Sequence, residues 1–214
     1  LTQLDLCLSY KFQINCLQAD VFKDLTNLKT LKLDNIILLA DGVFSPLVNL
    51  EDLCINVKMF SSLQENAFIG LENLKKITIK SGICIELSCK VFSQLKNLEI
   101  LELKFENIQN IKKEAFWKLG CLKKLSLVTE TFVTIQIEDN AFGGLEKLEE
   151  LNIVRGFENS NIFKLFNINN LRNLQLNVNQ IEILDNEVFS HLSSLQNLDL
   201  YLNQIKEIRK DAFK

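Results

Sequence analysis

The sequence contains few of the residues that interrupt regular structure. Its 214 residues include one proline and seven glycines, which leaves little material for flexible linkers between domains. No run of apolar residues approaches the roughly 20 that a membrane-spanning helix needs. A net charge of −3 is unsuited to general nucleic-acid binding, which requires a basic surface.

The residues that build active sites are also scarce. The single histidine, His191, lies next to Leu192 in a segment that we assign to a surface loop, and we expect a solvated, functionally silent imidazole. Cys54 alternates with Leu53 and Ile55 and is therefore expected on an exposed face, but no base accompanies it. No glycine-rich phosphate loop or C-x-x-C pair is present. We therefore predict a protein that is not an enzyme and that holds no metal or cofactor.

The six cysteines do not reveal the redox compartment. Cys7 lies close to Cys16 in the sequence, and Cys84 lies close to Cys89, so each of these pairs could form a disulfide. The other two cysteines have no evident partner. The alternative is that most of the six are small core residues with free thiols.

Phenylalanine recurs at a nearly constant interval. Eight phenylalanines are spaced by 22 to 26 residues, apart from one gap of 47 in which Leu165 takes the phenylalanine position, and leucine follows at the third and sixth positions wherever the chain continues. The eight are Phe22, Phe44, Phe68, Phe92, Phe116, Phe142, Phe189 and Phe213. Such self-similarity predicts eight or nine stacked units that fill residues 1–214 as a single domain, with the rings from Phe22 to Phe189 buried as one spine.

Each unit also carries the pattern L-x-x-L-x-L, as in Leu98, Leu101 and Leu103. The last two leucines alternate with the period of a β-strand. One unit cannot bury its apolar side alone, whereas stacked units share a continuous core and align their strands. We therefore predict an α/β repeat solenoid, a horseshoe with a curved parallel β-sheet on the concave face and loops or short helical turns on the convex side.

The full pattern, L-x-x-L-x-L…I-x-x-I…A-F-x-x-L-x-x-L, resembles the leucine-rich repeats of extracellular animal receptors such as Toll-like receptors, Slit proteins and variable lymphocyte receptors. Residues 66–74, Asn-Ala-Phe-Ile-Gly-Leu-Glu-Asn-Leu, match it well. The resemblance covers residues 1–214. It implies a secreted or cell-surface protein that binds a protein or another macromolecular ligand, and that reaches a membrane only through a segment outside this chain.

The sequence departs from these receptors in the turn that follows the strand. Their repeats usually place asparagine three residues after the last strand leucine, where the amide bonds to buried backbone. Only Asn179 and Asn203 fit; the other positions hold Ser9, Ile36, Lys58, Gly82, Glu106, Glu130 and Gly156. Lysine and glutamate are not buried unpaired, so we expect these turns to be rearranged, hydrated or turned outward, or the register to slip by one residue. Cysteine-rich caps are also missing, which leads us to expect a longer protein or partners at the ends.

Two patches on the concave face are the candidate binding sites. The first joins four lysines to an aromatic residue: Lys76, Lys80, Lys104, Phe105 and Lys124. Lysines on neighbouring strands repel one another, so we interpret this patch as a dock for an acidic partner with Phe105 as its apolar anchor. The alternative is that the lysines are simply solvated on an exposed sheet. The second patch is Val178, Tyr201 and Leu202 near the end of the chain. The alternative is that further repeats cover these residues.

Two functions are consistent with this sequence. The first is ligand recognition by an extracellular receptor resembling the Toll-like receptors of innate immunity. The alternative is an intracellular, cytoplasmic repeat protein that acts as a scaffold or adaptor, which is favoured by the absence of any N-x-[ST] glycosylation acceptor. The identity of the ligand and any dimerisation are not encoded in a recognisable pattern.

Overall fold

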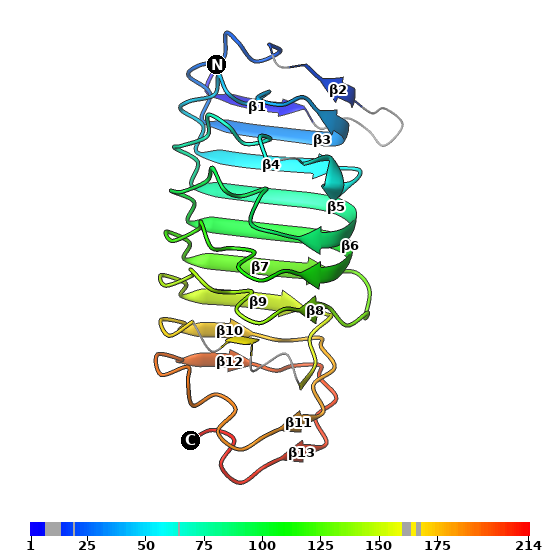
Figure 1. Cartoon of the computed structure of the whole chain (residues 1–214), viewed down its shortest axis with the longest axis vertical. Coiled ribbons are helices and arrows are strands. Elements are labelled where there is room, and N and C mark those ends of the chain that lie inside the picture. The colour runs from blue at the N-terminus through cyan, green and yellow to red at the C-terminus, as the bar shows by residue number, and fades with distance from the viewer. Residues whose placement is uncertain (7–13, 19, 64, 160–163, 166–167) are drawn as a thin grey trace.

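The computed structural model describes residues 1–6, 14–18, 20–63, 65–159, 164–165 and 168–214. These residues form a parallel β-solenoid, in which the chain winds through successive coils stacked along one axis (Figure 1). The N-terminus and the C-terminus lie at opposite ends of the stack (Figure 1).

One side of the solenoid is a large parallel sheet. Within the described residues, nine strands cross it in the order of the chain. They are β1 (Gln3–Leu6), β3 (Thr30–Leu39), β4 (Asp52–Val57), β5 (Lys76–Leu87), β6 (Ile100–Ile111), β7 (Lys124–Thr129), β9 (Glu150–Val154), β10 (Asn173–Gln175) and β12 (Asn197–Asp199). The strand leucines stay in register, since Leu53 pairs with Ile77 and Ile77 pairs with Leu101. The predicted parallel repeat sheet is therefore confirmed.

Smaller ladders lie beyond the bend at which the chain leaves the main sheet. β2 (Ile14–Leu17) pairs with the end of β3, and β8 (Gln136–Ile137) pairs with the end of β6. β11 (Ile183–Leu184) and β13 (Glu207–Ile208) form a separate parallel pair. The unit that spans residues 128–142 contains the short strand β8.

The side opposite the sheet is built from turns rather than helices. In each coil the F-x-x-L-x-x-L segment closes successive turns, as where Leu47 N donates to Phe44 O at 2.9 Å and Leu50 N donates to Leu47 O at 2.9 Å. A 3₁₀ helix, η1, spans Phe60–Ser62. The described residues otherwise hold almost no helix, so the helical part of the α/β prediction was wrong. The two successive turns take the place of a helix on this side of the coil, and they bring both leucines of the F-x-x-L-x-x-L segment into the core.

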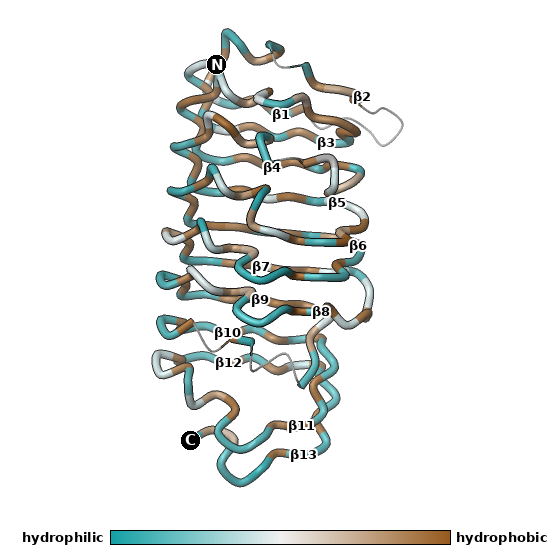
Figure 2. The backbone as a smooth tube through the Cα atoms, viewed as in Figure 1, coloured by the Kyte–Doolittle hydropathy of each residue, from teal (hydrophilic) through white to brown (hydrophobic). Residues whose placement is uncertain are grey.

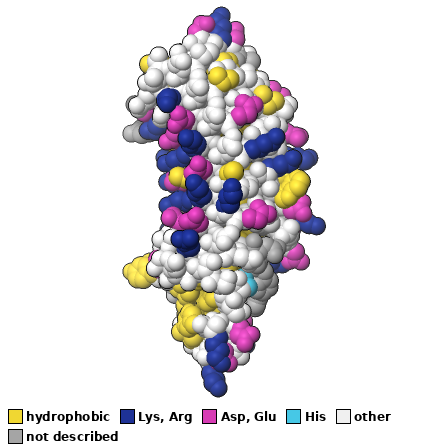
Figure 3. Space-filling view, turned by 90° about the vertical axis from the view of Figure 1, so that its left-hand side faces the viewer, with side chains coloured by type: hydrophobic (Ala, Val, Ile, Leu, Met, Phe, Trp, Pro, Cys, Tyr) yellow, Lys and Arg dark blue, Asp and Glu magenta, His cyan; other side chains and the backbone are white. Residues whose placement is uncertain are grey.

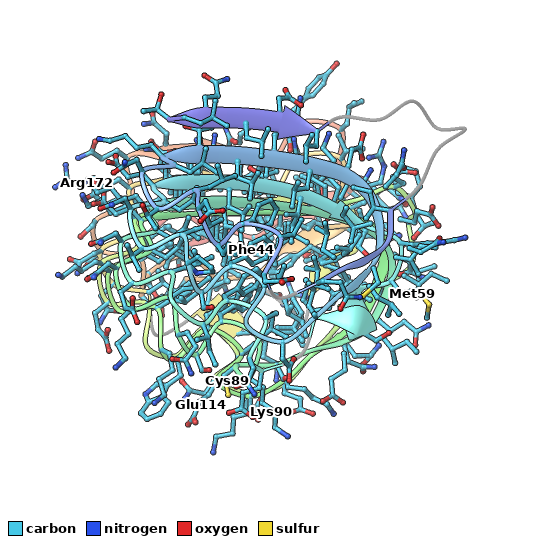
Figure 4. All side chains as sticks on the ribbon, turned by 90° about the horizontal axis from the view of Figure 1, so that it is seen from above. Phe44, Met59, Cys89, Lys90, Glu114 and Arg172 are labelled. Carbon is cyan, nitrogen blue, oxygen red and sulfur yellow. The ribbon has the colours of Figure 1, made fainter. Side chains whose placement is uncertain are left out.

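The phenylalanine spine is the centre of the core. The rings of Phe22, Phe44 and Phe68 stack with centroids 6.1 and 6.3 Å apart, and Phe116 stacks on Phe142 at 5.7 Å. Figure 4 shows Phe44 enclosed between the sheet and the turns, and Figure 2 shows apolar stretches recurring in every coil. The rings from Phe22 to Phe189 are buried as predicted, and Leu165 is buried in the phenylalanine position. Burial of a phenylalanine side chain contributes about 1.5–3 kcal/mol, so this column is a principal source of stability.

The coils bend away from the main sheet in two ways. In the middle coils the strand continues through the bend, so that β5 and β6 stay paired from Lys76 and Ile100 to Leu87 and Ile111. Alternation then turns the residue two positions after the last strand leucine into the core; these buried residues are Val57, Ser81, Phe105 and Thr129. The backbone at these bends is satisfied by the neighbouring strand.

Other coils bend through a left-handed residue at the same position. The φ angles are 56° at Asn35, 64° at Arg155, 59° at Val178 and 55° at Leu202. After Val178, the buried Asn179 donates to Ile153 O at 2.7 Å and accepts from Phe157 N at 2.9 Å. At Val178 and Leu202 the strand stops early and a side-chain amide takes the place of the ladder. After Asn35, by contrast, β3 runs on to Leu39 with a shift in its register.

Asn203 repeats this arrangement one coil later. Its Nδ2 donates to Leu176 O at 2.7 Å, and its Oδ1 accepts from Ile181 N at 3.1 Å. The two predicted asparagine turns are therefore confirmed. At the positions that lack asparagine, Lys58, Glu106 and Glu130 point outward and are exposed, as expected for unpaired charges. Ser9 lies outside the described residues.

Opposite charges alternate along the edge at which the strands begin. The residue just before each strand, from the second unit onward, is Lys29, Glu51, Lys75, Glu99, Lys123, Glu149 and Arg172. Lys29 pairs with Glu51 at 3.0 Å and Lys123 pairs with Glu99 at 2.7 Å. The hydrogen bond from each lysine lowers the pKa of its carboxylate. Figure 3 shows basic and acidic side chains intermixed on this side of the molecule, where Figure 4 places Arg172. We call this column the charge ladder.

Candidate functional site

The outward side chains of the main strands form a solvated surface that we call the sheet face. Leucine and isoleucine point inward at alternate positions of the main strands from β4 to β9, so mostly polar residues occupy the outward positions, with Ile100, Val128 and Val154 as apolar exceptions. Because adjacent strands lie about 4.8 Å apart, equivalent residues of successive coils form rows across this face. Two hollows, one in the middle coils and one in the later coils, lie on it.

Lys80 and Lys104 lie in the hollow of the middle coils. They are directly paired in register on β5 and β6, and both are exposed. Neither forms an ion pair with any other described residue. The hollow has a volume of about 650 Å³ and is bordered by Asn56, Glu106 and others. Two uncompensated cations are thus held side by side, as the sequence predicted.

The other two lysines of the predicted patch have different surroundings. Lys124 forms an ion pair with Glu150 at 2.9 Å, which offsets its charge. Lys76 is half-buried and lies between Asp52 and Ile100 in the row. Lys76 likewise forms no ion pair with the described residues, so Lys80 and Lys104 are the fully exposed lysines of the patch that lack one.

Phe105 is not on the sheet face, and the prediction of an exposed aromatic anchor beside the lysines was wrong. The ring is 1% exposed and packs edge-on against Phe60 at 5.0 Å. The reason is the bend: β6 continues through it without a left-handed residue, so Phe105 follows Leu101 and Leu103 into the core. The sequence carries no signal for this difference, since Leu198, Leu200 and Leu202 show the same alternation and yet Leu202 is exposed.

Tyr201 and Leu202 are exposed by 69% and 59%, as predicted for the second patch. Tyr201 N donates to Asp199 Oδ1 at 2.9 Å, which joins it to the last strand of the main sheet. Leu202 occupies the left-handed bend position, and its side chain is thereby turned away from the core.

The hollow of the later coils is lined by amides, which the sequence analysis did not single out. Its volume is about 580 Å³. The outward residues here are Asn152, Asn173, Gln175, Asn197 and Asp199, which we call the amide patch. Neutral amides carry no periodic or charge signal, and only the alignment of the strands brings these together.

A loop between β7 and β8 presents two further apolar side chains. Phe132 and Val133 are exposed by 55% and 52%. The guanidinium of Arg155 lies 5.2 Å from the Phe132 ring centroid, and Ile135 N donates to Gly156 O at 2.9 Å. This loop is thus fixed against the following coil.

The repeat sequence itself identifies the family. Residues 8–123 and 109–214 match the family described as the BspA type leucine rich repeat region, in six copies. The chain belongs to this family. The predicted leucine-rich-repeat protein is therefore confirmed. No curated protein matches this BspA-type chain.

Solved structures share the fold of this BspA-type chain. A crystal structure of a TLR13–ssRNA13 complex is similar with a TM-score of 0.73 and 24% identity, over 94% of this chain and 33% of that chain. An internalin, InlF from Listeria monocytogenes, is similar with a TM-score of 0.62 and 21% identity, over 97% of this chain and 60% of that chain. The chain thus spans about one third and three fifths of their lengths, and the likeness concerns the fold.

The thiols of the BspA-type chain are free at all five described cysteines. Cys84 and Cys89 therefore form no disulfide, and Cys7, the suggested partner of Cys16, lies outside the described residues. Burial raises the pKa of the Cys54 thiol, outweighing the opposite effects of Lys80 and Lys32, and raises the pKa of Cys84 to about 12. Neither thiol is poised as a thiolate nucleophile.

His191 is less solvated than its sequence context suggested. Both ring nitrogens are hidden from solvent, and burial lowers the pKa of the imidazole. The expectation of a solvated side chain was therefore wrong. No group of three or more candidate metal ligands occurs among the described residues. No helix within the described residues has the length and apolar character needed to cross a membrane.

Proposed function

We propose that this chain is a recognition module that acts by binding an acidic macromolecular partner on its sheet face, and that it belongs to a secreted or cell-surface receptor. The observation that carries the proposal is the pair Lys80 and Lys104, exposed and adjacent in a hollow without a carboxylate partner among the described residues.

Electrostatics supports this assignment. Two ammonium groups on neighbouring strands repel each other, so the folded chain gains nothing from their placement. A partner carboxylate between them would remove that repulsion and would be attracted over several ångströms. Lys76 and Lys124 would contribute to steering, while the buried Phe105 would shape the floor of the hollow.

An acidic protein fits the hollow better than a nucleic acid. Glu106 and Glu130 border the same hollow, and the whole chain is acidic. A continuous phosphate backbone would meet these carboxylates, whereas one aspartate or glutamate side chain can approach the two lysines alone. The TLR13 structure holds single-stranded RNA according to its title, so RNA is the informative comparison ligand.

Binding of poly-L-glutamate measured by biolayer interferometry tests the site. We expect Lys80→Glu/Lys104→Glu to weaken binding by at least about tenfold, mainly through slower association, and raised ionic strength to weaken the parent. The matched control is Lys90→Glu/Lys96→Glu, which makes the same change in net charge away from the sheet face; Figure 4 places Lys90 opposite the sheet.

Equal losses in the two double variants would mean that only net charge matters, and the site would be rejected. Binding of a single-stranded RNA oligonucleotide in preference to poly-L-glutamate would reject the acidic-protein assignment.

An intracellular scaffold is the second candidate, and the five free thiols favour it. Alkylation of the native protein without reduction, followed by intact mass measurement, distinguishes the two settings. Six alkylated thiols would support the intracellular scaffold, and any disulfide would support the secreted or cell-surface receptor.

A further inference from the structure

We propose that the amide patch, together with Tyr201, binds a neutral oligosaccharide. This ligand class and this surface are separate from the lysine hollow, because the two hollows share no lining residue.

The amide patch is a regular grid. Gln175 pairs in register with Asn152 on one side and with Asp199 on the other, while Asn173 pairs with Asn197. Neighbours in a row are about 4.8 Å apart, and alternate residues along one strand face the same way. Polar groups are thus presented at fixed intervals over three consecutive coils, on strands rather than on flexible loops.

The hydrogen-bonding capacity of this grid is largely unused. Asn197 Nδ2 donates to Asn173 Oδ1 at 2.6 Å, which leaves the Asn173 amino group and the Asn197 oxygen available. The Gln175 amide is exposed and makes no hydrogen bond with any other described residue. An amide offers a donor and an acceptor a short distance apart, and adjacent sugar hydroxyls offer the same pair in return.

Asp199 adds an oriented acceptor at the edge of the grid. Its carboxylate is held by Tyr201 N at 2.9 Å and by Asn177 Nδ2 at 3.4 Å. A carboxylate has about four acceptor positions, so two remain for hydroxyl donors. Preorganised acceptors of this kind lower the entropic cost of binding.

Tyr201 supplies an apolar surface beside the polar grid. The side chain is 69% exposed and lies two residues beyond Asp199. An aromatic ring exposed next to hydrogen-bonding groups suits a ligand with one apolar and one polar face. A pyranose has both, since its C–H groups lie on the ring face and its hydroxyls lie around the rim.

The charges in this hollow argue against other ligands. Lys124 is neutralised by Glu150 at 2.9 Å, and Asp199 would repel phosphate or sulfate. Three of the leucines that line the hollow, Leu125, Leu151 and Leu174, are buried beneath the amides, and the fourth, Leu198, is partly buried, so they offer little open apolar surface for a peptide side chain. A neutral polyhydroxylated ligand is what remains.

The test is isothermal titration of the whole chain with a panel of neutral tetrasaccharides built from glucose, mannose, galactose and N-acetylglucosamine. At least one should bind, and Tyr201→Ala should weaken it by at least about tenfold. Tyr201→Phe, which keeps the ring, should stay within about threefold of the parent, and Gln175→Leu should weaken binding while leaving the thermal midpoint unchanged.

Three results would overturn the proposal: no neutral tetrasaccharide binds, Tyr201→Ala binds like the parent, or Gln175→Leu binds like the parent. Lys80→Glu/Lys104→Glu keeps the failures distinct. It should leave neutral-saccharide binding intact, and it should weaken binding of poly-L-glutamate by at least about tenfold whether or not the saccharide site exists.

Discussion

The middle coils and the later coils carry the same repeat but turn the same bend differently. At Phe105 the strand runs on, the side chain enters the core and the backbone pairs with the next strand. At Val178 a left-handed residue ends the strand and Asn179 bonds to the exposed backbone groups. The comparison shows that the hydrogen bonds of the buried backbone groups at the bend can come either from the neighbouring strand or from an asparagine side chain, while the rest of the core stays the same.

The difference has a functional counterpart on the sheet face. Strands that continue through the bend, such as β5 and β6 with 12 residues each, hold Lys80 and Lys104 in register. Strands that stop early, such as β10 and β12 with three residues each, place Tyr201 and Leu202 on an exposed turn. The middle coils therefore present charge on a rigid sheet, and the later coils present amides and an aromatic ring.

The largest change in stability that would test this comparison is expected from a substitution at the bend position itself. Phe105→Ala should lower the free energy of unfolding by about 3–5 kcal/mol, because a buried ring that contacts Phe60 leaves a cavity. Chemical denaturation measures this loss. Leu202→Ala at the equivalent position of a left-handed bend should change stability by less than about 0.5 kcal/mol. Similar values for the two variants would contradict the two-bend description.

The next largest effect is at the asparagine. Asn179→Ala should cost about 2–4 kcal/mol, since Phe157 N–H and Ile153 C=O would both lose their partner in a buried site. Thermal and denaturant unfolding would report it. Glu106→Ala, at the same repeat position of a continuous bend, should be within about 0.5 kcal/mol of the parent. A costly Glu106→Ala would show that the charged residue has a structural role that its exposure does not reveal.

A smaller effect of opposite sign is expected from glycine at Val178. A β-branched residue with φ of 59° is strained, so Val178→Gly should leave stability unchanged or raise it by up to about 1 kcal/mol. Val57→Gly, at the equivalent position of a continuous bend, should instead lower stability by more than about 2 kcal/mol, because Val57 is buried. If both glycines destabilise equally, the left-handed bend is not strained.

The smallest effect is the pH dependence of His191. Burial lowers the pKa of this imidazole from its ordinary value of 6.5, so the unfolded chain binds the proton more tightly than the folded chain. The stability that His191 contributes is therefore complete above pH about 6.5 and is lost as the pH falls below it. His191→Gln should unfold with a flatter pH dependence between roughly pH 5 and 6.5. Identical pH profiles would show that the burial has no energetic consequence.

The fold was predictable because its determinants repeat. The interval between Phe68 and Phe92 gives the length of one coil. The leucines between them mark the strand and the side of the coil that is buried, and the same pattern recurs in the other coils. Asn179 and Asn203 could be assigned for the same reason. The error at Phe105 arose because Arg155 and Val178 adopt left-handed angles that their residue types do not announce, so the sequence does not show which coils end the strand.

The candidate sites were predictable only where charge or apolarity marked them. Lys80 and Lys104 could be recognised because they occupy equivalent positions in neighbouring repeats. Tyr201 could be recognised because an aromatic residue is unusual at the solvent-exposed end of a strand. The amide patch could not, because Asn173 and Gln175 look like ordinary solvated residues until three strands are laid side by side. The burial of His191 likewise depends on its packed surroundings and not on its own loop.

The charge ladder makes it important whether coils are gained or lost in even or odd numbers. Lys75, Glu99, Lys123 and Glu149 succeed one another with alternating sign. Loss of the single coil that carries Glu99 would place Lys75 against Lys123, whereas loss of that coil and the next would place Lys75 against Glu149. Like charges on neighbouring strands are unfavourable. A repeat protein of this kind can therefore be lengthened or shortened at this edge without penalty only by an even number of coils.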